Sequence, residues 1–394
     1  MQVLAPTPFA QYQTRNGTFT ADANAVIYGV TSGQALGDLL TEGCIPMAHS
    51  PLACFRNLLD GGDFTVNPWQ RGSSLTGIAN TVTYTADRFF AVGGASSSIS
   101  VSNVASTAIP SFGQVLQFGR ASANANTAPI YLGQVIETAD AIRCQGSYVT
   151  ISFWAAAGVN FSGSALSVAL HLGTGVNQSA ANMVAGSWTG QALPALVPAS
   201  APYAQTSGAA GAYGVGTAAT QAISTGFYRY SFTAFVPNTV TQIGLLVGYT
   251  PTGTAGVNDW VQFGGFQLEI GAAVSPFEHR DVQVELEIAQ RYCWVTNEPA
   301  ANVITAVGYC SGSNAQLFYM ASPVQFRTTP TVTVSAGTFK VHTNGSPVSP
   351  GTITGSGQPN AITLTATGVS GATGQGCALV GGGGAGSITA TADF

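Results

Sequence analysis

Short runs in which apolar and polar residues alternate fill most of this chain, and Gly, Ser, Asn and Pro separate them. The segments 148–154 (YVTISFW) and 228–235 (YRYSFTAF) are clear examples. Alternation of this kind is typical of strands that bury one face, and turn residues between the runs indicate antiparallel sheets. The pattern over 57–277 therefore predicts an antiparallel β-sandwich.

A second set of short apolar runs follows within 295–394, at 303–307, 331–334 and 361–365. These runs predict a second, smaller β-sandwich. The glycine run at 381–384 precedes the last of the expected strands, so it predicts either a flexible or a closely packed turn. It does not predict a phosphate loop, because no Lys and no helix follow it.

Helical spacing replaces alternation at the junction between these two parts. Ser275, Pro276 and Glu278 fit a capping box around an initial turn. Beyond it, apolar residues form two stripes at spacings of three and four, namely Val282, Leu286, Ala289 and Cys293, and then Val284, Ile288 and Tyr292. A helix with two apolar faces needs two surfaces to bury against.

One of those surfaces is expected to be the chain's own domain and the other a neighbouring copy. We therefore expect a homo-oligomer, a trimer, with this helix near the symmetry axis. Its contact residues are Val282, Val284, Leu286, Ile288, Ala289 and Tyr292. The alternative is a helix wedged between two domains of a monomer.

The chain has 394 residues, which is long for a single hydrophobic core. We expect an all-β protein of tandem β-sandwich or jelly-roll domains with a small N-terminal module and one short linker helix. The boundaries are 1–54 for the module, 55–280 for the jelly roll, 281–294 for the helix and 295–394 for the C-terminal sandwich. The module is expected to attach the chain to a larger particle, and the alternative is a flexible arm.

A stretch rich in Ala, Gly, Ser and Thr interrupts the alternation between Gly173 and Gly226. A loop of this length inside a compact domain is functional or mobile. We expect a contact surface here, and the alternative is a segment that covers the edge of a sheet.

Charge is scarce, since only 7% of the residues are Asp, Glu, Lys or Arg, whereas soluble domains have about 25%. Such a surface suits a protein packed densely in an assembly, although a neutral secreted β-protein fits as well. The net charge is −5 and Lys340 is the only lysine, so no basic patch exists. Nucleic acid is therefore not an expected partner.

The start of the chain lacks the pattern of a signal peptide, and no apolar run is long enough for a membrane span. The six cysteines are far apart in sequence and include no CxxC pair, which argues against zinc and against a disulfide framework. We expect buried free thiols. They are Cys44, Cys54, Cys144, Cys293, Cys310 and Cys377.

Two separated signatures carry a resemblance to a known family. The first runs from Asn57 (NLLDGGDF) through 68–72 (PWQRG) to 84–89 (YTADRF), and the second is FQLEIG at 266–271, followed by SPFE at 275–278 and AQRYCW at 289–294. Together they resemble fibre and spike proteins of tailed phages over about residues 55–294. The segment 324–333 (VQFRTTPTVT) is similar to the opening of the C-terminal domain in such proteins.

The ends of the expected sandwich also resemble those of carbohydrate-binding jelly rolls, in which the first and last strands lie near one another. That resemblance implies a fold more than a ligand. In such domains, carboxylates near these strands can hold a structural calcium. Asp60, Asp63 and Glu269 are the candidates here, and turn-forming aspartates are the alternative.

Sugar binding uses exposed aromatic rings together with amide or carboxylate groups. The candidates are Trp188, Tyr203, Tyr213, Asn258, Asp259 and Trp260. A role in a core or an interface is the alternative for these aromatics. Two other tryptophans, Trp69 and Trp154, lie in patterned strands and are expected in the core.

Catalytic chemistry finds little support in the sequence. The four histidines are isolated, GxSxG is absent, and the nearest carboxylate pairs lie in a turn (Asp60 and Asp63) and on the helix (Glu285 and Glu287). Glycoside hydrolysis needs two acids on facing walls of a cleft. We therefore expect no enzyme, no catalytic residue and no cofactor other than a possible structural calcium.

The function predicted from sequence is a structural fibre or spike protein of a tailed-phage virion, assembled in the host cytoplasm and exposed on the particle. It is expected to contact virion head, neck or tail proteins and to adhere to host-surface glycans. The first alternative is a head or neck decoration that binds only other virion proteins. The second is a polysaccharide-degrading tailspike.

Overall fold

The computed structural model describes residues 56–394 apart from 110, 199–218 and 336, together with the backbone of five short strands before residue 56. Those strands are β1 (Val3–Leu4), β2 (Gln11–Thr14), β3 (Gly17–Thr20), β4 (Val26–Ile27) and β5 (Ile45–Pro46). β1 pairs with β4 and β5, and β2 pairs with β3. The rest of the predicted attachment module, including Cys44 and Cys54, lies outside the described residues.

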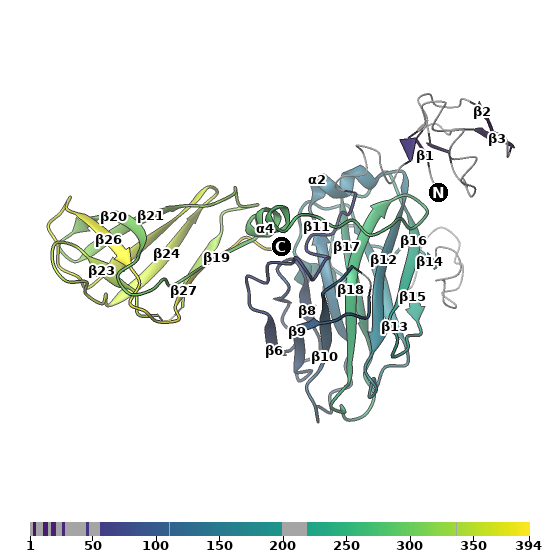
Figure 1. Cartoon of the computed structure of the whole chain (residues 1–394), viewed down its shortest axis with the longest axis horizontal. Coiled ribbons are helices and arrows are strands. Elements are labelled where there is room, and N and C mark those ends of the chain that lie inside the picture. The colour runs from purple at the N-terminus through teal and green to yellow at the C-terminus, as the bar shows by residue number, and fades with distance from the viewer. Residues whose placement is uncertain are drawn as a thin grey trace.

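The described chain forms two β-sandwiches joined through a short helix, so the predicted all-β class with tandem sandwiches is confirmed (Figure 1). One sheet of the first sandwich has the strand order β14-β16-β12-β18-β10-β9-β6. Its strands are β6 (Ser74–Ile78), β9 (Ile99–Ala105), β10 (Gln114–Arg120), β12 (Ser147–Ala157), β14 (Val197–Pro198), β16 (Tyr228–Val236) and β18 (Trp260–Ile270).

The opposing sheet has the order β15-β13-β17-β11-β8-β7. Its strands are β7 (Thr83–Tyr84), β8 (Phe90–Val92), β11 (Ile130–Ile136), β13 (Leu166–Gly173), β15 (Ala219–Gln221) and β17 (Gln242–Tyr249). Alternation explains the core between the sheets, since Ile151 and Phe153 of β12 point inward and are buried. The hydroxyl of Thr150, which precedes Ile151, lies on the other face, 3.0 Å from that of Thr233.

A bulge in β18 explains why two buried residues of this strand depart from the period of two. Phe263 and Phe266 are both fully buried although they are three positions apart. The register between β12 and β18 shifts at Ser152 and Trp154, and Gly265 has a φ of +56°. Because a left-handed residue costs little only when it is glycine, the pair Gly264-Gly265 lets both phenylalanines face the core.

The poorly patterned stretch from Gly173 is partly a cover for a sheet. It contains α3 (Ala180–Val184), which is capped by Ser179, and the side chains of Met183 and Trp188. These pack on outward-facing residues of the second sheet, including Ala169 and Leu246. The middle of the stretch, 199–218, is outside the described residues.

Between the sandwiches, α4 spans Val282–Gln290 and is shorter than the predicted 281–294. Two short helical turns, α2 (Thr138–Ala141) and η3 (Ile142–Cys144), lie elsewhere, between β11 and β12. The predicted capping box at Ser275 is wrong. Asp281 caps α4 by accepting a hydrogen bond from the Gln283 N–H at 2.8 Å, while the Ser275 N–H donates to Glu269 at 2.9 Å.

The second sandwich packs a sheet of order β23-β26-β20-β21-β25-β24 on one of order β19-β27-β22. Its strands are β19 (Cys293–Asn297), β20 (Ile304–Gly312), β21 (Ala315–Ala321), β22 (Thr331–Val334), β23 (Lys340–His342), β24 (Thr352–Gln358), β25 (Ala361–Thr367), β26 (Gly376–Val380) and β27 (Ser387–Thr391). We call it the distal sandwich.

The glycine run before β27 is a closely packed turn. The buried Glu298 carboxylate accepts hydrogen bonds from the Gly382 N–H at 2.7 Å and the Gly386 N–H at 3.0 Å. A methyl group on Gly382 would lie 1.9 Å from the Thr338 carbonyl oxygen, so side chains are excluded here. Burial acts to raise the pKa of Glu298, but the donated hydrogen bonds outweigh it and lower the pKa to about 2.

Candidate functional site

The two signature segments meet in space, as their resemblance to jelly-roll ends predicts. The Leu58 N–H donates to the Leu268 carbonyl at 2.7 Å. The Asn57 side chain accepts from the Leu268 N–H at 3.0 Å and donates to the Phe266 carbonyl at 2.9 Å. These hydrogen bonds to the backbone close the sandwich next to α4, where the Gly61 N–H donates to Glu285.

The three carboxylates proposed for calcium are each engaged by protein donors. Asp60 lies 3.2 Å from the Arg88 Nε, Asp63 lies 2.7 Å from the His279 Nδ1, and Glu269 accepts from the Ser275 N–H. Within the described part of the chain, no group of His, Cys, Asp or Glu side chains is arranged to hold a metal ion. The alternative, aspartates that shape a turn, fits better, since the Asp63 carboxylate accepts from the Thr65 N–H at 3.0 Å.

The joint between the sandwiches gathers charges that are rare elsewhere in the chain. Arg88 is 1% exposed, and its guanidinium lies 3.4 Å from the centre of the Tyr292 ring. Arg71 pairs with Asp393 at 2.6 Å, and the Arg291 Nε donates to Glu137 at 2.8 Å. These contacts fix the helix and the chain's last residues against the first sandwich (Figure 1).

The helix residues proposed for an oligomer interface are placed differently from the two predicted stripes. Ala289 and Tyr292 are buried inside the chain's own joint, and Tyr292 follows the helix rather than lying in it. The buried face also contains Glu285, which is 4% exposed. Val284, Leu286 and Ile288 are half-buried, and Val282 is 57% exposed. The helical wheel put Ala289 and Tyr292 on different stripes, although both are buried, and it did not include the buried glutamate.

At the opposite end of the first sandwich, a buried ion pair organises several loops. Arg120 and Asp259 are fully buried, and their closest charged atoms are 2.6 Å apart. Arg120 also donates to carbonyls of four loop residues, which are Asn124, Asn126, Thr252 and Gly253. Asp259 accepts from the Ser162 N–H at 2.9 Å and from the Tyr249 hydroxyl at 3.4 Å. Asp259 is therefore an anchor of the loops and is not available to a sugar, contrary to the prediction.

The neighbouring residues Asn258 and Trp260 are half-buried at the surface of this end. The Trp260 side chain lies between two glycines. A methyl group on Gly158 would be 2.9 Å from its Cδ2, and one on Gly119 would be 2.6 Å from its Cβ. The next outward position of β18 is Gln262, whose side-chain amide donates to the Gln117 side chain at 3.0 Å.

We call Trp260, Gln262, Gln117 and Asn258 the loop-end patch. Asn258 and Trp260 were predicted from the sequence, but the two glutamines were not, nor was the role of Arg120 in holding the loops beside the patch. The alternation marks the glutamines as outward-facing, but nothing in the spacing shows that strands β10 and β18 are neighbours.

The other predicted sugar-binding aromatics do not join this patch. The Trp188 side chain is 3% exposed and donates to the Ser179 carbonyl at 2.9 Å, so its ring is not available for stacking on a sugar. The alternative of a core role is correct for it. Tyr203 and Tyr213 lie outside the described residues.

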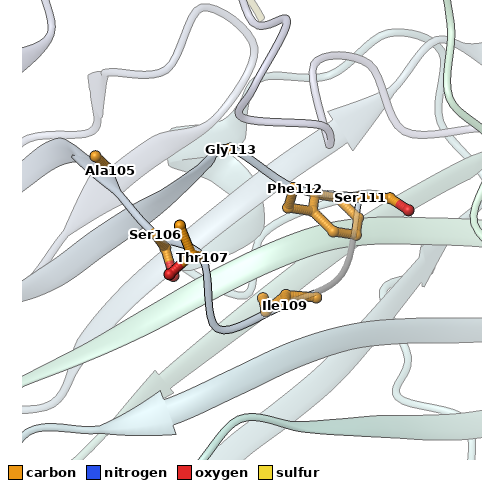
Figure 2. A pocket seen from close by; sticks show the side chains of 7 residues that line it. All are labelled: Ala105, Ser106, Thr107, Ile109, Ser111, Phe112 and Gly113. Carbon is orange, nitrogen blue, oxygen red and sulfur yellow. The ribbon is translucent and has the colours of Figure 1, made fainter.

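A pocket of about 450 Å³ lies at the β9–β10 loop (Figure 2). Figure 2 shows that Ile109 and Phe112 provide its apolar lining and that Ser106, Thr107 and Ser111 provide hydroxyl groups. The Phe112 ring packs against the Trp154 ring, with ring centres 5.2 Å apart. The pocket is built from one loop and contains no charged residue.

Neither family models nor curated protein sequences match this chain. Among the described residues, no helix is both long and apolar enough to cross a membrane.

Three solved structures illustrate the distant similarities. A putative sugar-binding protein from Bacteroides thetaiotaomicron has a TM-score of 0.30 at 12% identity, covering 55% of this chain and 100% of its own. The tandem CBM22 domains of Paenibacillus barcinonensis Xyn10C have a TM-score of 0.28 at 13% identity, covering 80% of this chain and 97% of their own. The enzymatically active domain of tailspike protein 4 from bacteriophage CBA120 has a TM-score of 0.29 at 11% identity. The similarity covers 55% of this chain but only 22% of the chain in that structure.

Proposed function

We propose that this protein is a structural fibre or spike component of a tailed-phage virion whose first sandwich adheres to uncharged glycans on the host surface. The observation that carries the proposal is the loop-end patch. It combines an indole and three amide side chains beside loops that are held by the buried Arg120–Asp259 ion pair.

The chemistry of the patch suits a neutral sugar. An indole offers a flat apolar face to a sugar ring, and amides both donate and accept hydrogen bonds. A ligand that meets loops already fixed by hydrogen bonds loses less conformational entropy on binding. A single site of this kind binds weakly, so adhesion depends on many copies on one particle.

The role as a rigid virion component is supported by the joint and by the composition. Several ion pairs hold the two sandwiches in one arrangement, and a surface with 7% charged residues permits dense packing of copies. We propose no hydrolytic role, because Asp60 and Asp63 are paired with Arg88 and His279 rather than placed across a cleft.

A decoration protein that binds only other virion proteins is the second candidate. The observation that favours it is the burial of Trp188 and Asp259, which removes two groups from the predicted sugar site.

The two candidates are separated by a binding assay with host cells and a glycan array. Trp260→Ala is expected to weaken binding about tenfold or more, equivalent to about 1.4 kcal/mol. The matched control is Tyr148→Ala, an aromatic residue that is 42% exposed near the other end of the same sheet. Absence of any glycan or cell binding by the unmodified protein would favour the decoration role.

A further inference from the structure

The outer face of the large sheet in the distal sandwich is apolar and exposed. Along β20 and β21, alternate residues such as Ala306, Cys310 and Phe318 point into the core. The positions between them point away from it. Their exposures are 63% for Val307, 51% for Tyr309 and 60% for Tyr319. The register of β20 shifts between Ile304 and Ala306, which interrupts the alternation, and Ile304 is 60% exposed. We call these four residues and the half-buried Leu317 the distal face.

Strand register brings these residues into one patch. Val307 lies opposite Tyr319, and Tyr309 lies opposite Leu317, across the β20–β21 ladder. The two strands are central in the sheet order, so the patch occupies its middle rather than an edge. On the next strand, Thr363 and Thr365 lie opposite Tyr319 and Leu317. Figure 1 shows the distal sandwich extending away from the first, so that its contact with the first sandwich is the joint.

Charge is absent from the middle of this face. Between Pro299 and Ala392 the only residues of the Asp, Glu, Lys and Arg types are Arg327 and Lys340. Arg327 donates to the Ala392 carbonyl at the joint, and Lys340 lies on the edge strand β23. A charged partner would lose hydration here without gaining an opposite charge, whereas a second copy meets an equally neutral surface.

The side chains also favour a protein surface over a sugar. Tyr309 and Tyr319 have flat rings, but Val307, Ile304 and Leu317 do not. The central polar neighbours of the rings are hydroxyls rather than the amides or carboxylates that a sugar site combines with an aromatic ring. Apolar patches that are larger than isolated surface residues mark protein interaction sites. The helix α4 is a weaker candidate, because Ala289 and Tyr292 are already buried in their own chain.

We propose that the distal face is the surface through which copies of this chain associate, in place of the helix. Burying it removes exposed Val, Ile and Tyr side chains from water, which favours association in proportion to the apolar area buried. Sheet faces pack well because rows of side chains interdigitate. The inference rests on the proposed fibre or spike role, for which three copies are expected.

The test is the mass of the full chain in solution by light scattering, measured over a range of concentrations. Wild type is expected to have a multiple of the chain mass. Tyr319→Glu is expected to shift the protein toward single chains by at least tenfold in the association constant, because a carboxylate is placed at the centre of the buried face. Two matched controls, Val282→Glu on α4 and Val176→Glu on the first sandwich, replace valines that are 57% and 70% exposed and are expected to keep the wild-type mass.

Several results would overturn the inference. They are a wild type that is a single chain at every concentration, a Tyr319→Glu variant that keeps the wild-type mass, and dissociation by Val282→Glu alone. A Tyr319→Glu variant with unchanged mass but weaker glycan binding would identify the distal face as a sugar surface instead. Thermal unfolding of each variant confirms that it is folded. The adhesion proposal is tested separately, by the glycan and cell binding assay with Trp260→Ala.

Discussion

At the scale of single residues, the few charged side chains of the first sandwich act mainly in its construction. Arg120 and Asp259 illustrate this, because both are fully buried and each satisfies several loop groups. Sequence analysis assigned Asp259 to a sugar site because it stands beside a tryptophan. Its burial could not be read from the sequence, since its partner Arg120 is far away along the chain.

We predict that removing either member of this pair strongly destabilises the first sandwich. Asp259→Asn or Arg120→Ala leaves an uncompensated buried group, and the expected loss in the free energy of unfolding is about 3–5 kcal/mol. Denaturant unfolding followed by tryptophan fluorescence measures the loss. Arg143→Ala is the control, because Arg143 and Asp140 form a pair that is 53% and 50% exposed, for which less than about 1 kcal/mol is expected. Equal losses in both cases would contradict the assignment.

At the scale of elements, α4 shows how a tertiary neighbour changes the meaning of a helical wheel. Its buried face includes Glu285, whose carboxylate accepts from the Gly61 N–H at 2.9 Å and lies 3.4 Å from Arg280. Burial raises the pKa of Glu285 to about 7, although Arg280 acts in the opposite direction. The wheel could not anticipate this, because the Gly61 N–H belongs to a segment far away along the chain and Arg280 precedes the helix.

We predict that Glu285 makes the protein less stable as the pH rises. Below pH 4.5, the ordinary pKa of a glutamate side chain, Glu285 is protonated in both the folded and the unfolded state and causes no change in stability with pH. Between pH 4.5 and about 7 the unfolded chain releases the proton while the folded chain keeps it, so the free energy of unfolding falls, and the loss is complete above that range.

The measurement is the Tm at pH 5 and pH 8. Glu285→Gln keeps an acceptor for the Gly61 N–H but no longer titrates, so the fall in Tm between the two pH values is expected to be smaller than in wild type. Glu287→Gln, at an exposed position of the same helix, is expected to follow wild type. An unchanged pH dependence in Glu285→Gln would contradict the prediction.

At the scale of the whole molecule, the joint determines how the distal sandwich is presented. The Phe394 ring stacks on Tyr292 with ring centres 6.2 Å apart, and the Arg327 guanidinium lies 4.1 Å from the centre of the Phe394 ring. The Tyr84 hydroxyl donates to the Phe394 carbonyl at 3.3 Å. The joint therefore includes residues from both sandwiches, from α4 and from the last positions of the chain.

We predict that Phe394→Ala combined with Arg71→Ala loosens the joint without unfolding either sandwich. Small-angle scattering is expected to show a broader distribution of interdomain distances, and limited proteolysis is expected to show faster cleavage within 271–281. Lys340→Ala, a charge change on the distal sandwich away from the joint, is the control. A scattering profile identical to that of wild type would show that the remaining contacts alone fix the arrangement.

The sequence by itself determined the fold class, the two sandwiches and the position of the helix between them. These features follow from local periodicity, because a strand that buries one face must alternate and a helix must repeat every three to four residues. The close approach of the signature segments at Asn57 and Leu268 also followed from the resemblance. The scarcity of charge was a property of composition alone.

Only the tertiary structure decided which side chains are available to a ligand or a partner. Trp188, Asp259 and Tyr292 each look accessible along the chain, but segments distant in sequence bury them. The reverse holds for Gln117 with Gln262 and for Val307 with Tyr319, which become neighbours only through strand pairing. Local periodicity defines which face of a strand a residue occupies, whereas the neighbours of that face depend on long-range packing.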